Sequence, residues 1–162
     1  MKEPIASPPL THLDNHGRAC MVDVGDKPST CRRAVAAGRV RVSPRLAQHI
    51  QADTLVKGNL LEVARLAGIQ AAKRTDELIP LCHSLPLDHV QVQARLEGSH
   101  VHLRAEVRTT WKTGVEMEAL AAVAVAALTV IDMGKAVDKG ITIEEIRLLE
   151  KTGGKSGDYR TE

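Results

Sequence analysis

Aromatic side chains are almost absent from this chain of 162 residues, which has no Phe, one Trp and one Tyr. Proteins that bind single-stranded nucleic acids stack bases on aromatic rings, so the shortage counts against that class of function. The net charge of +2 is also too small to indicate a general nucleic-acid or membrane partner. The core must therefore be aliphatic, and local basic clusters favour small anions as partners.

Patterns for disulfides, secretion and membrane spans are equally scarce. The three cysteines, Cys20, Cys31 and Cys82, form no CxxC pair, and the opening "MKEPIASPPL" is Pro-rich without the apolar run of a secretory signal. The longest aliphatic run has about 13 residues, fewer than the roughly 20 that span a bilayer. We expect a cytoplasmic protein with a flexible tail at 1–10, a single domain at 11–158 and a short tail at 159–162.

The first half of the chain predicts extended segments followed by helices. Residues 19–24 and 31–43 have the composition of strands and are separated by a turn. A short helix is expected over 43–50, with Ser43 as its N-cap. A longer helix is expected over 58–80, because Asn59 and Glu62 have capping-box spacing and a proline ends the pattern.

The second half predicts a hairpin, a long helix and a last strand. Residues 87–110 alternate apolar and polar on both sides of a Gly-Ser turn. A helix over 113–140 is expected to begin at a capping box of Thr113 and Glu116, and 141–150 reads as a strand. Together these elements predict an α+β sandwich, an antiparallel sheet with helices on one face and an N-terminal strand extension.

Asp132 and Lys135 interrupt the most apolar segment of the chain, "MEALAAVAVAALTVIDMGK". Residues three apart on a helix share a face, so the carboxylate and the ammonium group are expected to pair. If the helix stays buried here, such a pair shifts both pKa values and suits proton transfer. If the helix surfaces here, the pair is an ordinary solvated salt bridge. Gly134 favours the functional interpretation, because a glycine inside a helix costs about 1 kcal/mol.

The segment "IPLCHSLPL", residues 79–87, joins a helix to the hairpin and is a second candidate site. Ordered loops of this kind often carry functional side chains. His83 is a candidate general acid or base, although a structural histidine is an equally good interpretation. Cys82 is a weaker candidate nucleophile, because neighbours in sequence need not act together in space.

Two carboxylates and several basic residues are candidate binding groups for a ring with N–H donors and for phosphate, and backbone N–H groups at the helix start are an alternative anion site. Glu116 is explained by its capping box, whereas Glu118 has no such role and can accept hydrogen bonds from the amide edge of a guanine or pterin. Lysines next to Gly153 and Gly154 suit phosphate, because bare backbone approaches an anion closely. The cationic candidates are Arg32, Arg33, Lys57, Lys73, Arg74, Lys151 and Lys155.

Four long blocks stand in one order: "VKGNLLEVARLAGIQAAKRTDELIPLCHSLPL", "KTGVEMEAL", "ALTVIDMGKAVDK" and "RLLEKTGGKSG". They resemble the MoaC family, the cyclic pyranopterin monophosphate synthases of molybdenum cofactor biosynthesis, from about Thr11 to Asp158. The resemblance implies a ferredoxin-like fold and a lyase that converts 3′,8-cyclo-7,8-dihydro-GTP to cyclic pyranopterin monophosphate and pyrophosphate. It also implies a homohexamer, a trimer of dimers with active sites between subunits, and a radical-SAM GTP cyclase as the upstream partner.

The resemblance also implies roles for individual residues in these blocks. The implied catalytic residues are Asp132, Lys135 and Lys57. The implied substrate-binding residues are Leu81, Cys82, His83, Met117 and Glu118, with polar pocket positions at Arg32, Lys73, Glu116 and Lys151. The reaction moves protons around a triphosphate, so no cofactor is expected, with Mg²⁺ beside the triphosphate left open.

Some positions depart from the family pattern, and other functions stay open. Trp111 is expected to alter the pocket rim and Gly134 to loosen the turn that carries Lys135, while Asn59 and Ser84 replace a frequent aspartate and a frequent proline. A nucleotide-binding protein without chemistry would tolerate Asp132→Asn, and an oligomeric scaffold would not bind triphosphate saturably. A metal site is the weakest candidate, because two histidines on the polar side of a strand, His100 and His102, have no further ligand pattern.

Overall fold

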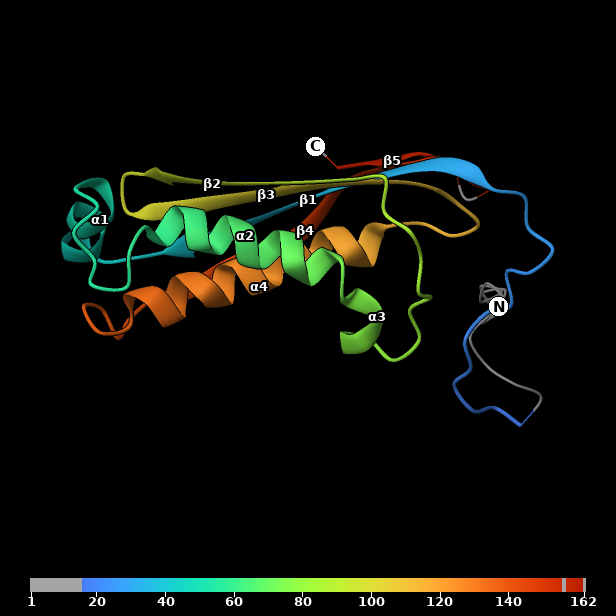
Figure 1. The fold of residues 1–162 in the computed structure, drawn as a ribbon, viewed down its shortest axis with the longest axis horizontal. Helices are drawn as coiled ribbons and strands as arrows, with labels where there is room; N and C mark the ends of the chain where they lie inside the picture. The colour runs from blue at the N-terminus through green and yellow to red at the C-terminus, as the bar shows by residue number, and fades with distance from the viewer. Residues whose placement is uncertain (1–15, 156, 162) are drawn as a thin grey trace, which may run out of the picture.

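The computed structural model describes residues 16–155 and 157–161, which form a five-stranded sheet with helices on one face (Figure 1). The elements in chain order are β1 (Thr30–Arg41), α1 (Pro44–Gln51), α2 (Leu60–Ala72), α3 (Thr75–Leu78), β2 (His89–Glu97), β3 (His100–Trp111), α4 (Glu116–Gly134), β4 (Thr142–Thr152) and β5 (Tyr159–Arg160). The strand order is β2-β3-β1-β4-β5, with every neighbouring pair antiparallel. This is the predicted ferredoxin-like α+β arrangement, with β1 inside the sheet between β3 and β4.

The core is aliphatic, as the composition requires. Along β3, alternate residues face the helices and are buried: Val101, Leu103, Ala105 and Val107. The opposite face of the sheet carries charged side chains, so the alternation follows the period of a half-buried strand. The helix α4 meets the sheet with small side chains, chiefly Ala119, Ala122, Val123 and Ala126, all fully buried. Figure 1 shows α4 and α2 lying side by side beneath the sheet.

The helices α2 and α4 approach each other closely at Gly68. A Cβ atom at this position would lie 2.9 Å from the carbonyl oxygen of Ala122 and 3.1 Å from a methyl group of Val92. Alanine normally stabilises a helix relative to glycine by roughly 1 kcal/mol. Here we expect Gly68→Ala to destabilise the protein by about 1–3 kcal/mol, because a backbone atom cannot move aside cheaply. Urea unfolding, with the exposed change Gln70→Ala as control, measures the effect; a more stable variant would contradict the packing argument.

Two predictions for the first half of the chain are wrong. Residues 20–24 form no strand, because their main chain is used elsewhere: the carbonyl oxygen of Val22 contacts His83 instead of a neighbouring strand.

The expected helix 58–80 is two helices, broken after Ala72. The hydroxyl of Thr75 donates to the carbonyl oxygens of Ala71 and Ala72, at 3.1 and 3.2 Å, and so satisfies the end of α2. The predicted cap of α2 is confirmed, since Asn59 accepts from the amide of Glu62.

The long helix α4 ends at Gly134 and not at Gly140. The space next to Gly134 is filled by side chains, because a Cβ there would lie 2.6 Å from Leu46 and 2.8 Å from Ile141. The carboxylate of Asp138 then accepts from the amides of Ser43 and Gly140, which holds the following segment as a turn against α1. The departure to glycine therefore belongs to a packed helix end, and the expected loosening of the turn stays a prediction.

The two predicted tails have different outcomes. The tail predicted at 159–162 contains β5, which pairs with β4, while the tail predicted at 1–10 lies outside the described residues.

By length and composition α4 could cross a membrane, but 56% of its apolar window is buried inside the fold. It is therefore the core helix of this domain, and its hydropathy is explained by packing.

Candidate active site

A cavity of about 610 Å³ opens at the N-terminal end of α4. The register Thr30↔Trp111 brings the start of β1 and the end of β3 to the same place, and the end of β4 adds the glycine-rich turn. Six cationic side chains and one carboxylate, that of Glu116, line this cationic cavity: Lys27, Arg32, Arg33, Lys112, Lys151 and Lys155. Such an excess of positive charge in a concave site favours a small polyanion.

The guanidinium of Arg32 lies against the Gly153–Gly154 turn. Its Nη1 donates to the carbonyl oxygen of Gly153 at 3.3 Å, and its Nε is buried without a hydrogen-bond partner among the described residues. Both glycines have positive φ angles, +90° and +88°, and a Cβ on Gly154 would lie 1.7 Å from Nη1. The bare backbone of these glycines is therefore approached by an arginine side chain, and the predicted approach of a phosphate stays a prediction.

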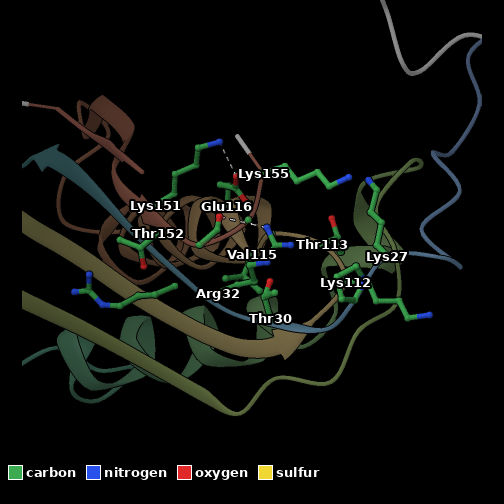
Figure 2. A pocket seen from close by; sticks show the side chains of 15 residues that line it. Lys27, Thr30, Arg32, Lys112, Thr113, Val115, Glu116, Lys151, Thr152 and Lys155 are labelled. Atoms are coloured by element: carbon green, nitrogen blue, oxygen red, sulfur yellow. Dashed lines mark hydrogen bonds and ion pairs between the residues drawn. The ribbon is translucent and has the colours of Figure 1, made fainter. Parts of the chain in front are cut away.

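Glu116 and Lys151 form an ion pair of 3.4 Å inside the cationic cavity, which Figure 2 marks with a dashed line between their charged ends. The carboxylate of Glu116 lies over Gly114, where a Cβ would be 1.9 Å from Oε2. The predicted capping box is therefore wrong, because this carboxylate turns away to Lys151 and the N-cap of α4 is Val115, without a side-chain hydrogen bond.

A second cavity of about 400 Å³ adjoins the first and shares Lys27, Thr113, Gly114 and Glu116 with it. Its remaining lining comes from three segments: Val22, Val24, Leu81, Cys82, His83, Leu85, Met117 and Glu118. This His83–Glu118 cavity thus brings together six of the nine residues implied to bind the substrate: Leu81, Cys82, His83, Glu116, Met117 and Glu118. Its apolar and polar lining suits a heterocyclic ring, next to a cavity that suits phosphates.

Glu118 is the buried carboxyl group of the site, with 4% of its surface exposed. Burial raises its pKa to about 7, with smaller contributions from the negative charges of Glu116 and Asp76. A carboxyl group that is half protonated near neutral pH can both give and take a proton. Burial and the same kind of negative neighbours, Glu118 and Asp76, also raise the pKa of the Cys82 thiol, which makes it a poor nucleophile.

The raised pKa of Glu118 gives a testable dependence of stability on pH. Between the unfolded value of 4.5 and the folded value of about 7, the folded protein holds a proton that the unfolded chain releases. This contribution is therefore lost as the pH rises through that window. We expect Glu118→Gln to match the wild type in unfolding free energy near pH 4.5 and to exceed it by about 2–3 kcal/mol at pH 8. Urea unfolding at equal protein concentration measures this, and a pH-independent difference would contradict it.

The predicted catalytic residues form a separate group, the Asp132 cluster. Asp132 accepts from Lys135 at 2.6 Å and from Lys57 at 2.9 Å, which confirms the predicted pairing of Asp132 with Lys135 and adds Lys57. Of the two alternatives for this pair, the single chain shows the one in which the helix surfaces: the exposed side-chain fractions are 56% for Asp132, 61% for Lys135 and 47% for Lys57. The functional interpretation, in which the pair is withdrawn from water, is therefore wrong for the single chain. Hydrogen bonds from Lys135 and then Lys57 lower the pKa of Asp132 to about 2, so in this setting it is ionised and a weak base.

The predicted site residues thus lie at opposite ends of α4. Asp132 follows Glu116 by sixteen positions along the helix, a distance of about 24 Å at 1.5 Å per residue. In Figure 1, α4 begins at the end of the molecule where α3 and the loop after it lie, and it ends beside α1. Lys73 joins neither group, because it is the exposed C-cap of α2 and lines a different hollow with Leu87.

Sequence reasoning missed Lys27, Lys112 and Val22. Lys27 lies in the turn before β1 and Lys112 directly follows β3, where its Nζ donates to the carbonyl oxygen of Gly25 at 2.5 Å. The antiparallel pairing of β1 with β3 brings Lys27 and Lys112 to the same place. The alternation of apolar and polar residues along the two segments could have predicted this pairing. Val22 contacts His83 through its main chain, which no side-chain pattern reveals. Trp111 pairs with Thr30 at the border of the cationic cavity, so its effect on the rim stays a prediction.

The two histidines considered for a metal site lie on the charged face of the sheet. His100 contacts Glu144 at 3.4 Å and His102 contacts Glu97 at 3.8 Å, with the two rings 6.2 Å apart. Among residues 16–155 and 157–161, no group of three or more His, Cys, Asp or Glu side chains could hold a metal ion.

Comparison with known proteins places the whole domain within one group. The profile of the MoaC family matches residues 21–154. A relative from Thermomicrobium roseum, named cyclic pyranopterin monophosphate synthase, is 57% identical over 155 residues, which cover 94% of this chain and 93% of the relative. Relatives of the same name from Roseiflexus sp. and Parvibaculum lavamentivorans are 58% and 56% identical, over 93% and 96% of this chain and 96% and 99% of their own length.

Proposed function

The chain belongs to the MoaC family, and we propose that it works as a cyclic pyranopterin monophosphate synthase. In this role it is a lyase of molybdenum cofactor biosynthesis that converts 3′,8-cyclo-7,8-dihydro-GTP to cyclic pyranopterin monophosphate and pyrophosphate. The observation that carries the proposal is the contact between the cationic cavity and the His83–Glu118 cavity, which share four residues. One accommodates a triphosphate and the other a purine or pterin ring.

The cationic cavity supports the phosphate part of the reaction. A cyclic phosphate forms when a sugar hydroxyl bonds to the α-phosphorus and the bond to the β-phosphate breaks, so pyrophosphate leaves with the electron pair of that bond. Arg32, Lys27 and Lys151 line this cavity and would neutralise the leaving pyrophosphate, and Lys112 and Lys155 would add to the positive field. The charge of Arg33 is already compensated by Glu106 and Glu150, at 2.8 and 2.6 Å.

The His83–Glu118 cavity supports the ring chemistry. Opening a purine ring and closing a pterin ring needs groups that accept and return protons near neutral pH. Glu118 meets that need through its pKa of about 7. Leu81 and Met117 add apolar contacts to the ring.

The Asp132 cluster reaches this substrate only from another subunit. A separation of about 24 Å along α4 exceeds what groups on one substrate can share, and an exposed Asp132 with a pKa of about 2 is a poor base. Cover by a partner subunit would remove water from the cluster and raise its capacity for proton transfer. We therefore propose a homo-oligomer, a hexamer built as a trimer of dimers, whose sites combine the two cavities of one subunit with Asp132, Lys135 and Lys57 of a neighbour.

Pyrophosphate release tests the function directly. The purified protein, given the cyclised GTP intermediate, should release pyrophosphate with formation of the pterin. Asp132→Asn and Lys57→Ala should each lower turnover by about 10²–10⁴-fold, because each removes a proton-transfer or charge-stabilising group. Circular dichroism should show both variants folded, since both side chains are exposed. Full turnover in both variants would refute the assigned roles, and triphosphate binding without turnover by the wild type would favour a binding protein.

The same reaction determines which cofactor, upstream enzyme and cellular location we propose. We propose that it uses no cofactor, since proton transfer and phosphate displacement need no redox centre, with Mg²⁺ accompanying the triphosphate as part of the substrate. The substrate would come from a radical-SAM GTP cyclase, and both enzymes would work in the cytoplasm, without a membrane or nucleic-acid partner.

A further inference from the structure

His83 is hydrogen-bonded to a segment 61 residues away in sequence, and this contact decides which ring nitrogen is available. Its Nε2 lies 2.7 Å from the main-chain carbonyl oxygen of Val22. A carbonyl oxygen only accepts hydrogen bonds, so Nε2 must carry the hydrogen. In the neutral ring the lone pair is then on Nδ1.

The Val22 carbonyl is itself held in place by the segment that contains it. The main-chain amide of Lys27 donates to the carbonyl oxygen of Val24 at 3.1 Å, and the amide of Gly25 donates to the carboxylate of Asp23 at 2.8 Å. The carbonyl oxygen of Gly25 accepts from Lys112. This strap, residues 22–27, is thereby attached to the end of β3, and Val22, Val24 and Lys27 line the cavity that His83 also lines.

We propose that His83 acts on the substrate through Nδ1 alone, as a proton acceptor, and that the main chain of Val22 is a positioning group for it. This proposal rests on the proposed function for the identity of the substrate. When Nδ1 takes a proton from the substrate, the ring becomes cationic while Nε2 still donates to Val22. That hydrogen bond then becomes charge-assisted and stronger, which stabilises the cation until the proton returns to the product.

The tautomer is measured without any substrate. Long-range ¹H–¹⁵N correlation at pH 8 should show His83 with a protonated Nε2 and an unprotonated Nδ1, the signal being assigned by its loss in His83→Gln. Val22→Gly, which frees the main chain at the contact, should mix the two tautomers. Val24→Gly, whose carbonyl oxygen accepts from Lys27, should leave the His83 tautomer unchanged. A protonated Nδ1 in the wild type, or an unchanged tautomer in Val22→Gly, would overturn the positioning role.

Kinetics with two amide variants tests the use of Nδ1. The amide nitrogen of His83→Gln can replace Nε2 as donor to Val22, but it leaves no acceptor at the place of Nδ1. We expect KM within about 2-fold of the wild type and kcat lowered by about 100-fold, in the range of general acid–base effects. His83→Asn loses the Val22 contact and should raise KM as well. Wild-type kcat in His83→Gln would overturn the proposal. A wild type without turnover would refute the proposed function instead, while the tautomer result would stand.

Discussion

Two inactive variants, Asp132→Asn and Glu118→Gln, are expected to recover activity when their subunits are mixed. Each variant alone removes one part of every site. In a mixed dimer, the site that takes Glu118 from one chain and Asp132 from the other is intact, and the second site carries both changes. Random mixing makes half the dimers mixed, each with one good site in two, so about a quarter of wild-type activity should return.

The mixing experiment needs subunit exchange and a matched control. The two variants are unfolded together in urea, refolded together and assayed for pyrophosphate release. The control mixes Asp132→Asn with Lys57→Ala, two changes within the Asp132 cluster; every mixed dimer then lacks an intact site, and activity should stay at the level of the separate variants. No recovery with Glu118→Gln would show that each site lies within one subunit, whereas recovery in the control would show that Lys57 and Asp132 of one chain serve different sites.

Gly154→Ala is expected to raise the KM for the triphosphate substrate at least 10-fold, with kcat less affected. The new Cβ would lie 1.7 Å from Nη1 of Arg32, so the guanidinium must leave its place beside Gly153. A displaced charge contributes less to binding, and charge-assisted hydrogen bonds are worth about 1.5–3 kcal/mol, roughly 10- to 150-fold in affinity. Steady-state kinetics measures the loss of affinity for the substrate, and product inhibition measures the loss of affinity for pyrophosphate. Both ligands should bind more weakly.

Gly157→Ala is the matched control for this change. Gly157 also has a positive φ, +70°, so alanine there carries a similar backbone cost, but a Cβ would meet nothing within 4 Å. It should lower stability slightly and leave KM near the wild-type value. Equal effects of the two alanines on KM would mean that backbone strain in the loop, and not displacement of Arg32, controls binding.

Local signals predicted most of the fold, and the failures share a cause. The hairpin β2–β3 and the caps at Ser43 and Asn59 follow from alternation and from short hydrogen bonds, and the structure contains them. The boundaries of α4 were wrong because tertiary partners decided them. Glu116 turned to Lys151 in place of a cap, and Asp138 tied the end of the helix to α1.

The candidate site was predicted less completely than the fold. Motif resemblance identified the residues, and the cavities unite Leu81, His83, Glu118, Arg32 and Lys151 at one end of α4. The separation of the Asp132 cluster follows from the 19-residue length of α4, for which the pattern had indicated a still longer helix over 113–140. The main-chain contact of Val22 could not be predicted, because every residue type offers the same carbonyl.

Trp111, at the border of the cationic cavity, has a practical consequence for measurement. As the sole indole of the chain, it makes the intrinsic fluorescence of the protein a single-position signal from the place where the nucleotide should enter. Emission titrations can therefore follow ligand uptake without an attached dye, and in mixed assemblies a Trp111→Leu chain silences one subunit type optically. Because the chain has only one tryptophan and one tyrosine, its absorbance at 280 nm is weak, so concentrations are better taken from peptide-bond absorption or amino-acid analysis.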